Sequence, residues 1–205
     1  MATYQRVGFG QVEPNHLSAQ RTAQIYAQLP AASDIKILEN GQFVKYDYAN
    51  GECNFTGAGE WMMVFNEVKL YDDFWRESYK DFAMIDDNYT AGTYTQSYLD
   101  DKTIKTREVG VSHYGVGPFP GKMVPRVIKT NVGDIYTTNC LFVGNTNGKA
   151  VVTAATEMDE LKGKLMTPNE DGYLEVVEDG DFLWQVAKVY TMADGQAAVK
   201  LMRVK

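Results

Sequence analysis

The sequence predicts a mainly β fold, a small β-barrel or β-sandwich body with an extended N-terminal arm and one or two short helices. Short runs of β-branched and aromatic residues recur along most of the chain, separated by Gly, Asp and Asn at the spacing of about 8 to 12 residues typical of such folds. Few segments have helical periodicity. With 205 residues, the chain is long enough for one domain with appended arms.

Residues 1–33 are predicted to form the arm. They contain few charges and much Gln and Ala, and Gly8, Gly10 and Pro14 interrupt any early periodicity. Asn15 is placed to cap a short helix bearing Leu17, Ile25, Tyr26 and Leu29, which is too short to be stable without a surface to lie on. Either a disordered terminus or an arm that orders on a partner fits this pattern, and its deletion is expected to leave a folded body.

Residues 34–205 are predicted to form the β-rich body. In DIKILENGQFVKYDY, the Asn40-Gly41 pair lies between two short apolar runs and predicts a hairpin. The run WMMVFNEVKLY is apolar on both faces, which is typical of a central strand. In VYTMADGQAAVKLMRV, the Asp194-Gly195 pair predicts a second hairpin.

An acidic and aromatic insertion at about residues 71–123 interrupts this pattern. It begins with YDDFWRESYKDFAM, whose aromatic residues are spaced as on a helix, and it includes the Tyr- and Thr-rich stretch YTAGTYTQSY, which we expect to be an exposed loop. Beyond the insertion, TEMDELKGKL, around Leu161, is the second helix candidate. No linker is long enough to require separate domains.

Charge and cysteine content exclude several classes of protein. The net charge of −7 argues against sequence-independent binding to nucleic acid, and residues 71–101 carry 8 acidic against 2 basic side chains. No apolar run is long enough to span a membrane, and the N-terminus lacks a signal-peptide pattern, so synthesis in the cytoplasm is the default expectation. Cys53, Cys140, His16 and His113 form no zinc or disulfide framework.

Three Asp-Asp pairs recur at a spacing of fourteen residues, at Asp72-Asp73, Asp86-Asp87 and Asp100-Asp101. On one helix, successive pairs would lie about 21 Å apart, and on one strand roughly 46 Å apart. Such distances do not allow convergence on one metal ion, so caps and turns explain the pairs better. Because the G-x-S-x-G motif and any phosphate-binding loop are also missing, we expect no catalytic, metal or cofactor residues. A hydrolase using these carboxylates stays an alternative.

The aromatic residues divide into two groups. Trp61, Phe65, Trp75, Phe82 and Trp184 lie in strand or helix patterns and are expected in the core. A second group lies in the arm and in the Tyr-rich stretch, where apolar bodies with polar tips suit a partner surface. The predicted contact residues are Tyr4, Phe9, Leu17, Ile25, Tyr26, Tyr89, Tyr94 and Tyr98.

The segments VKYDYANGECNFTGAGEWMMVFNEVKLYDD, VGDIYTTNCLFVG and WQVAKVYTMADGQAAVKLMRV resemble auxiliary head proteins of tailed bacteriophages, the decoration or cement proteins of the capsid exterior. The resemblance covers about two-thirds of the chain and implies a β-barrel or β-tulip-like body that forms homo-oligomers, with trimers favoured. It also implies an arm that docks on subunits of the major capsid protein or on a neighbouring copy of this chain. The protein would then lie on the virion surface after synthesis in the host cytoplasm. A glycan- or receptor-binding β module of a phage fibre or baseplate is the alternative, with the loop at residues 89–98 as its binding element.

Overall fold

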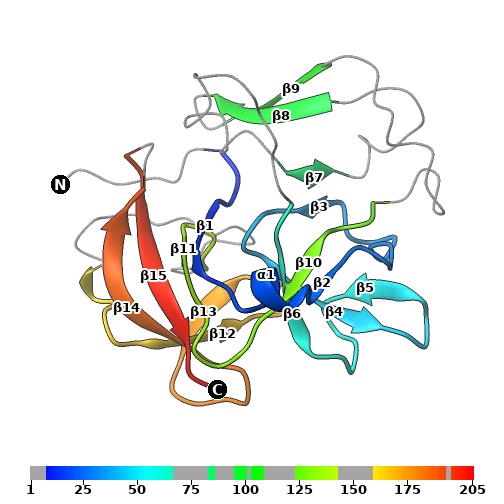
Figure 1. Cartoon of the computed structure of the whole chain (residues 1–205). Coiled ribbons are helices and arrows are strands. Elements are labelled where there is room, and N and C mark those ends of the chain that lie inside the picture. The colour runs from blue at the N-terminus through cyan, green and yellow to red at the C-terminus, as the bar shows by residue number, and fades with distance from the viewer. Residues whose placement is uncertain are drawn as a thin grey trace.

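The computed structural model describes residues 8–66, 83–85, 95–100, 103–108, 123–142, 159–192 and 195–205, with backbone alone for residue 85 and for those between 95 and 108. Over these ranges the chain forms antiparallel strands and one four-residue helix, α1 (Ala19–Thr22). The predicted mainly β class is confirmed. Two sheets lie against each other (Figure 1), so of the two predicted architectures the structure has the sandwich-like one.

The larger sheet has six antiparallel strands in the order β1-β11-β15-β14-β12-β13. Its strands are β1 (Val12–His16), β11 (Ile135–Thr138), β15 (Ala197–Arg203), β14 (Trp184–Thr191), β12 (Leu165–Pro168) and β13 (Leu174–Val177). Strands β14 and β15 pair antiparallel up to Thr191 and Ala197, which confirms the predicted hairpin, although Asp194 itself lies outside the described residues.

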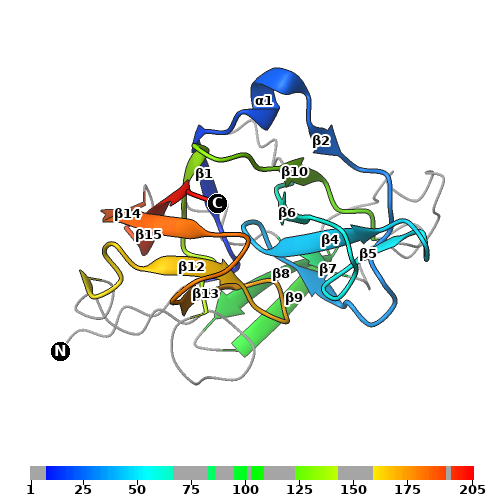
Figure 2. The same ribbon diagram turned by 90° about the horizontal axis from the view of Figure 1, so that it is seen from below.

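The smaller sheet has five antiparallel strands in the order β2-β10-β6-β4-β5. Its strands are β2 (Ile25–Tyr26), β10 (Val127–Lys129), β6 (Trp61–Val64), β4 (Phe43–Asp47) and β5 (Glu52–Asn54). Two further pairs are β3 (Ile37–Leu38) with β7 (Met84–Ile85), and β8 (Thr95–Asp100) with β9 (Thr103–Glu108). In Figures 1 and 2, the β4–β5 hairpin projects on the side of the molecule opposite β14 and β15.

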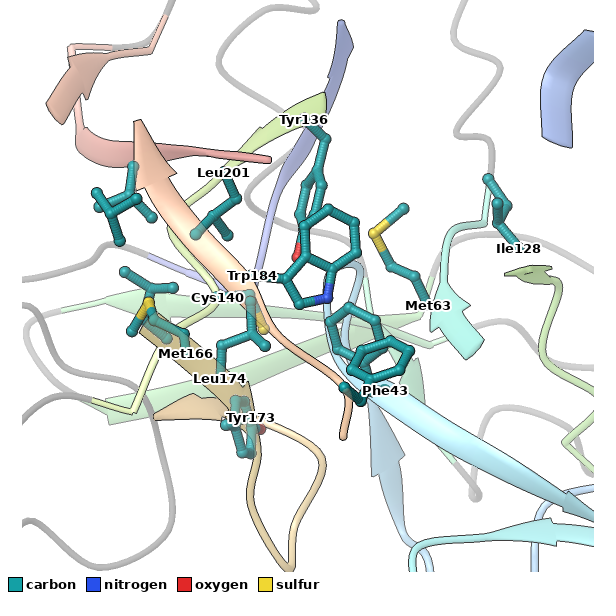
Figure 3. Close-up of a cluster of buried hydrophobic side chains, with 14 of the residues drawn as sticks. Phe43, Met63, Ile128, Tyr136, Cys140, Met166, Tyr173, Leu174, Trp184 and Leu201 are labelled. Carbon is teal, nitrogen blue, oxygen red and sulfur yellow. The ribbon is translucent and has the colours of Figure 1, made fainter. Parts of the chain in front are cut away.

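The main core lies between the two sheets and is centred on Trp184 of β14, which is fully buried. Its ring contacts Tyr136 of β11 edge-on, with 4.8 Å between ring centroids, and lies 6.0 Å from Phe43 of β4. Figure 3 shows the indole beside Tyr136, Met63 and Phe43. Because Phe43 and Met63 belong to the smaller sheet, this contact joins the two layers.

A second core covers the other face of the smaller sheet. Met62 and Val64 of β6 point into it, whereas Met63 of the same strand points into the main core. The segment around Leu38 and the short strand with Met84 lie over this face. Strand β6 is therefore buried on both sides at the centre of its sheet, which confirms the central-strand prediction from its two-sided apolar run.

The structure corrects the prediction of a separate N-terminal arm for residues 8–33. Strand β1 is an edge strand of the larger sheet and β2 an edge strand of the smaller one, with α1 between them. Beyond β2, the amide of Ala32 donates to the carbonyl of Cys53 on β5 at 2.9 Å. Pairing with strands far along the chain thus stabilises a segment whose own periodicity is weak. The helix predicted after Asn15 is confined to α1.

The hairpin predicted at Asn40-Gly41 is wrong, although a turn does form there. Strand β3 pairs with β7, and β4 pairs with β5 and β6, so the strands on either side of the turn belong to different sheets. Gly41 has φ of 91° and its amide donates to the carbonyl of Val64 at 2.9 Å. The turn is therefore fixed by contact with β6 rather than by a hairpin partner.

The predicted insertion at about residues 71–123 contributes β7, β8 and β9 to the fold. Residues 95–98 of the expected Tyr-rich loop belong to strand β8, which corrects the loop prediction for that part. The helix candidate at residues 71–84 lies outside the described residues except for its end at Ala83 and Met84, and Met84 is in a strand. Of the candidate around Leu161, residues 159–164 form a helical end and turn.

Candidate interaction surfaces and buried polar groups

The predicted contact residues fall into three groups. Phe9 and Leu17 are 5% and 2% exposed and belong to the interior, Leu17 as part of the main core, so their assignment to a partner surface is corrected. Ile25 and Tyr26 on β2 are half-buried against the main and second cores. Tyr4, Tyr89 and Tyr94 lie outside the described residues, and Tyr98 is known only as a backbone position in β8.

A row of three tyrosines leads to the exposed end of the β4–β5 hairpin. Tyr26 contacts Tyr46 edge-on with 6.3 Å between ring centroids, and Tyr46 contacts Tyr48 in the same way at 5.9 Å. Tyr46 is buried, and burial raises the pKa of its hydroxyl. Tyr48 is 76% exposed. The exposed ring of Tyr48 therefore packs on the buried ring of Tyr46. An exposed aromatic ring held in this way is typical of contact residues at interfaces.

Asp47 braces this hairpin end. Its Oδ1 accepts hydrogen bonds from the amides of Ala49 and Asn50 at 3.0 and 3.2 Å. Its Oδ2 accepts from the side-chain amides of Asn50 and Asn54 at 2.9 and 3.3 Å. The hydrogen bonds from Asn50 hold the pKa of the Asp47 carboxyl below its usual value. The turn that carries Tyr48 is thereby fixed by its own side chains. We name residues Asp47 to Gly51 the tyrosine tip.

Acidification is expected to loosen the tyrosine tip only below the usual pKa of an aspartate. The Asp47 pKa is lowered in the folded protein, so its hydrogen bonds are intact above the unfolded pKa and are lost as the pH falls through the folded value. The amide resonances of Ala49 and Asn50, followed by NMR as a function of pH, should titrate with a midpoint below 3.8. A midpoint at or above this value would contradict the bracing role.

The outer face of the larger sheet offers a second surface, on the opposite side of the molecule. Lys188 of β14 and Lys200 of β15 are cross-strand partners, and their Nζ atoms lie 5.3 and 5.2 Å from the ring centroid of Tyr190. Met202 on the same strand as Lys200 is 36% exposed. This face is basic on a protein of net charge −7. It is a weaker contact candidate than the tyrosine tip because its aromatic ring is half-buried under the two lysines.

A buried polar cluster surrounds Glu39, whose side chain is fully inaccessible to solvent. The carboxylate accepts hydrogen bonds from the amide of Gly10 at 2.6 Å and from the hydroxyl of Tyr173 at 3.0 Å. The Glu39 amide donates to Gln42, whose side chain donates to the carbonyl of Asp171. These contacts join the segments before β1, after β3 and before β13. A carboxylate so enclosed has no access to a substrate, and its role is to fasten three segments together.

Replacing Glu39 with Ala is expected to lower the free energy of unfolding by about 3 kcal/mol, because it removes the acceptor of two buried hydrogen bonds to a charged group. Glu39→Gln keeps an acceptor oxygen and should lower the free energy of unfolding by less than Glu39→Ala does. Chemical denaturation with urea measures both values. Equal stability of Glu39→Ala and the unmodified protein would contradict the fastening role.

Neither cysteine forms a disulfide, and both are buried. Burial raises the pKa of the Cys53 thiol to about 12. Since the thiolate is the nucleophile and the metal ligand, Cys53 is unsuited to either task at neutral pH. Cys140 is fully buried, next to the Glu39 cluster.

Iodoacetamide should therefore label Cys53 very slowly in the folded protein at pH 8. The thiolate fraction is roughly a thousandfold below that of an ordinary cysteine with a pKa near 8.5, and the side chain is also covered. Mass spectrometry of peptides after timed labelling gives the rate at Cys53. Urea-unfolded protein is the control and should react fast, whereas equal rates in both states would show that the thiol is accessible.

The described residues contain no group of three or more His, Cys, Asp or Glu side chains that could hold a metal ion. The Asp pairs at 72–73 and 86–87 lie outside these ranges, as does Asp101, and Asp100 is described only as backbone in β8. No helix within the same ranges is long and apolar enough to cross a membrane. No protein-family model, curated protein or solved structure matches the chain.

The tyrosine tip is not among the contact residues predicted from the sequence. Tyr46 and Tyr48 stand two residues apart in VKYDYANG, so an alternating strand would place both on one face. The Asn50-Gly51 pair that follows is a turn signal equal to the one at Asn40-Gly41. Together these two signals could have located the tip.

Proposed function

We propose that the protein is a structural component of a tailed-bacteriophage virion, a decoration or cement protein that binds the outside of the capsid shell and stabilises it without catalysis. The observation that carries the proposal is the tyrosine tip, a braced hairpin end that presents Tyr48 to solvent above a buried aromatic row. Support also comes from the sequence resemblance to auxiliary head proteins, which implies a trimer on the major capsid protein.

A braced tip suits binding to a repeating lattice. Because Asp47 already holds the turn, little conformational entropy is lost when the tip meets a partner. Tyrosine provides a large contact area with only two side-chain torsions to fix, and it is enriched among residues that dominate binding energy. If the protein is a trimer, three tips bind one shell at once, so each contact can be weak.

The test is co-sedimentation of the purified protein with empty shells assembled from the major capsid protein of the same phage. Tyr48→Ala should weaken binding by about 2 kcal/mol, which is roughly thirtyfold in Kd. Tyr190→Ala is the matched control, since it removes a tyrosine from the opposite face. The proposal fails if the unmodified protein does not sediment with shells, and the assignment to the tip fails if both variants bind alike.

A glycan- or receptor-binding module is the second candidate, and the neighbours of Tyr48 favour it. The exposed ring has the Asp47 carboxylate and the Asn50 side-chain amide on the same turn, a combination of aromatic face and polar groups that suits a sugar. A glycan array separates the two candidates. A decoration protein is expected to bind no glycan on the array. Binding of a glycan by the unmodified protein but not by Tyr48→Ala would favour the glycan-binding module.

A further inference from the structure

We propose that Asn50 is a site of spontaneous deamidation, and that the fold directs this reaction to the tyrosine tip while protecting an identical dipeptide elsewhere. The described residues contain two Asn-Gly pairs, Asn40-Gly41 and Asn50-Gly51. In this dipeptide, glycine lacks the side chain that would hinder attack of its amide nitrogen on the preceding side chain. The two pairs have the same covalent chemistry and opposite surroundings.

The reaction needs only water and the two residues. The Gly51 amide nitrogen loses its proton and attacks Cγ of Asn50, a C–N bond forms, and the side-chain nitrogen leaves as ammonia with a proton from solvent. Water then opens the resulting succinimide at either carbonyl. The products are aspartate, with the original backbone, and isoaspartate, in which the backbone passes through the former side chain.

The surroundings of Asn50-Gly51 leave room for this rearrangement. Asn50 and Gly51 are both exposed. Gly51 has φ of 68°, and no atom lies within 4 Å of the position that a Cβ would occupy. Within the part of the chain that the structure describes, Asn50 is held by hydrogen bonds from its backbone and side-chain amides to the Asp47 carboxylate. These hydrogen bonds are exposed to solvent, so breaking them costs less free energy than opening the buried surroundings of Asn40.

The surroundings of Asn40-Gly41 prevent it. Asn40 is 6% exposed, its Oδ1 accepts from the amide of Asn66 at 2.7 Å, and its Nδ2 donates to the Asn66 carbonyl at 3.2 Å. The attacking nitrogen of Gly41 is itself bound to the carbonyl of Val64 at 2.9 Å. A Cβ on Gly41 would lie 2.7 Å from Oγ1 of Thr138. Deamidation here would have to break three hydrogen bonds in a crowded interior.

Deamidation would change the tyrosine tip directly. Asn50 Nδ2 is a donor to Oδ2 of Asp47, so its replacement by a carboxylate removes this bond and places a second negative charge beside the first. Isoaspartate would also lengthen the backbone within the turn. Both changes act next to Tyr48. The chemical claim does not depend on the proposed function, and shell binding by the deamidated protein is a separate measurement.

The experiment incubates the full chain at mildly alkaline pH and follows each Asn-Gly peptide by mass spectrometry, with isoaspartyl methyltransferase to detect isoaspartate. In the folded protein, Asn50 should react at least about tenfold faster than Asn40, since each factor of ten corresponds to about 1.4 kcal/mol of local opening. In urea the two rates should converge. Asn50→Ser should abolish the modification of that peptide.

Equal rates at Asn40 and Asn50 in the folded protein would overturn the proposal, as would an Asn50 that stays unmodified when folded but reacts in urea. Asn147-Gly148 lies outside the described residues, and its peptide is measured separately so that its deamidation is not attributed to Asn50.

Discussion

A chain that begins at residue 34 is not expected to fold. This truncation removes an edge strand from each sheet, together with Leu17 and Ala19, which are 2% and 0% exposed in the main core. It also removes the Gly10 amide that donates to the buried Glu39 carboxylate. The loss of the Leu17 side chain alone is expected to lower the free energy of unfolding by about 2 to 5 kcal/mol. The total for a typical domain is roughly 5 to 15 kcal/mol.

Circular dichroism during heating checks this prediction, because a chain without cooperative structure shows no sharp transition. Two point variants make the test quantitative. Leu17→Ala should fold with a lowered free energy of unfolding, and Val132→Ala, at a side chain that is 68% exposed, should stay within about 0.5 kcal/mol of the unmodified protein. A truncated chain that unfolds cooperatively at the original Tm would restore the interpretation of residues 8–33 as an arm.

Trp184→Ala should lower the free energy of unfolding by about 3 to 5 kcal/mol. This is the largest effect expected of a single substitution. The indole is fully buried and contacts aromatic rings from both sheets, so its loss leaves a cavity where the layers meet. Urea denaturation monitored by far-UV circular dichroism gives the change without relying on the fluorescence of Trp184 itself.

Tyr136→Phe is the matched control for Trp184→Ala. It keeps the ring that contacts Trp184 and removes a hydroxyl that is buried without a hydrogen-bond partner among the described residues. Removing such a hydroxyl should leave the stability unchanged or raise it slightly. A large loss in Tyr136→Phe, or a loss below about 1 kcal/mol in Trp184→Ala, would contradict the central position of this ring pair.

Local sequence signals located those elements whose partners are adjacent in the chain or whose burial is two-sided. The β14–β15 hairpin follows from alternation around Asp194-Gly195, and β6 from an apolar run without alternation. Asn40-Gly41 is an equally strong turn signal, but the amide of Gly41 donates to the carbonyl of Val64 in β6. No local sequence pattern indicates that partner. Two similar turn signals thus have different outcomes, because a hydrogen bond to a strand distant in sequence fixes the turn at Asn40-Gly41.

The candidate site illustrates the same limit. Phe9 and Leu17 were interpreted as contact residues because weak periodicity in a Gly-interrupted segment is typical of an arm, yet pairing of β1 with β11, more than a hundred residues away, buries them. Tyr48 was missed because it stands in a strand pattern beside Tyr46, and sequence alternation does not reveal which of the two is covered. The covering contact comes from Tyr26 and the segment after β2.

The central claim, that this β protein decorates a capsid shell, is tested most directly by electron cryomicroscopy of shells incubated with an excess of the protein. We expect added density on the outer surface at symmetry-related positions, at a copy number proportional to the capsid subunits, with the β4–β5 hairpin directed at the shell. Shells that stay bare at saturating protein, or that carry density only on the inner surface, would contradict it.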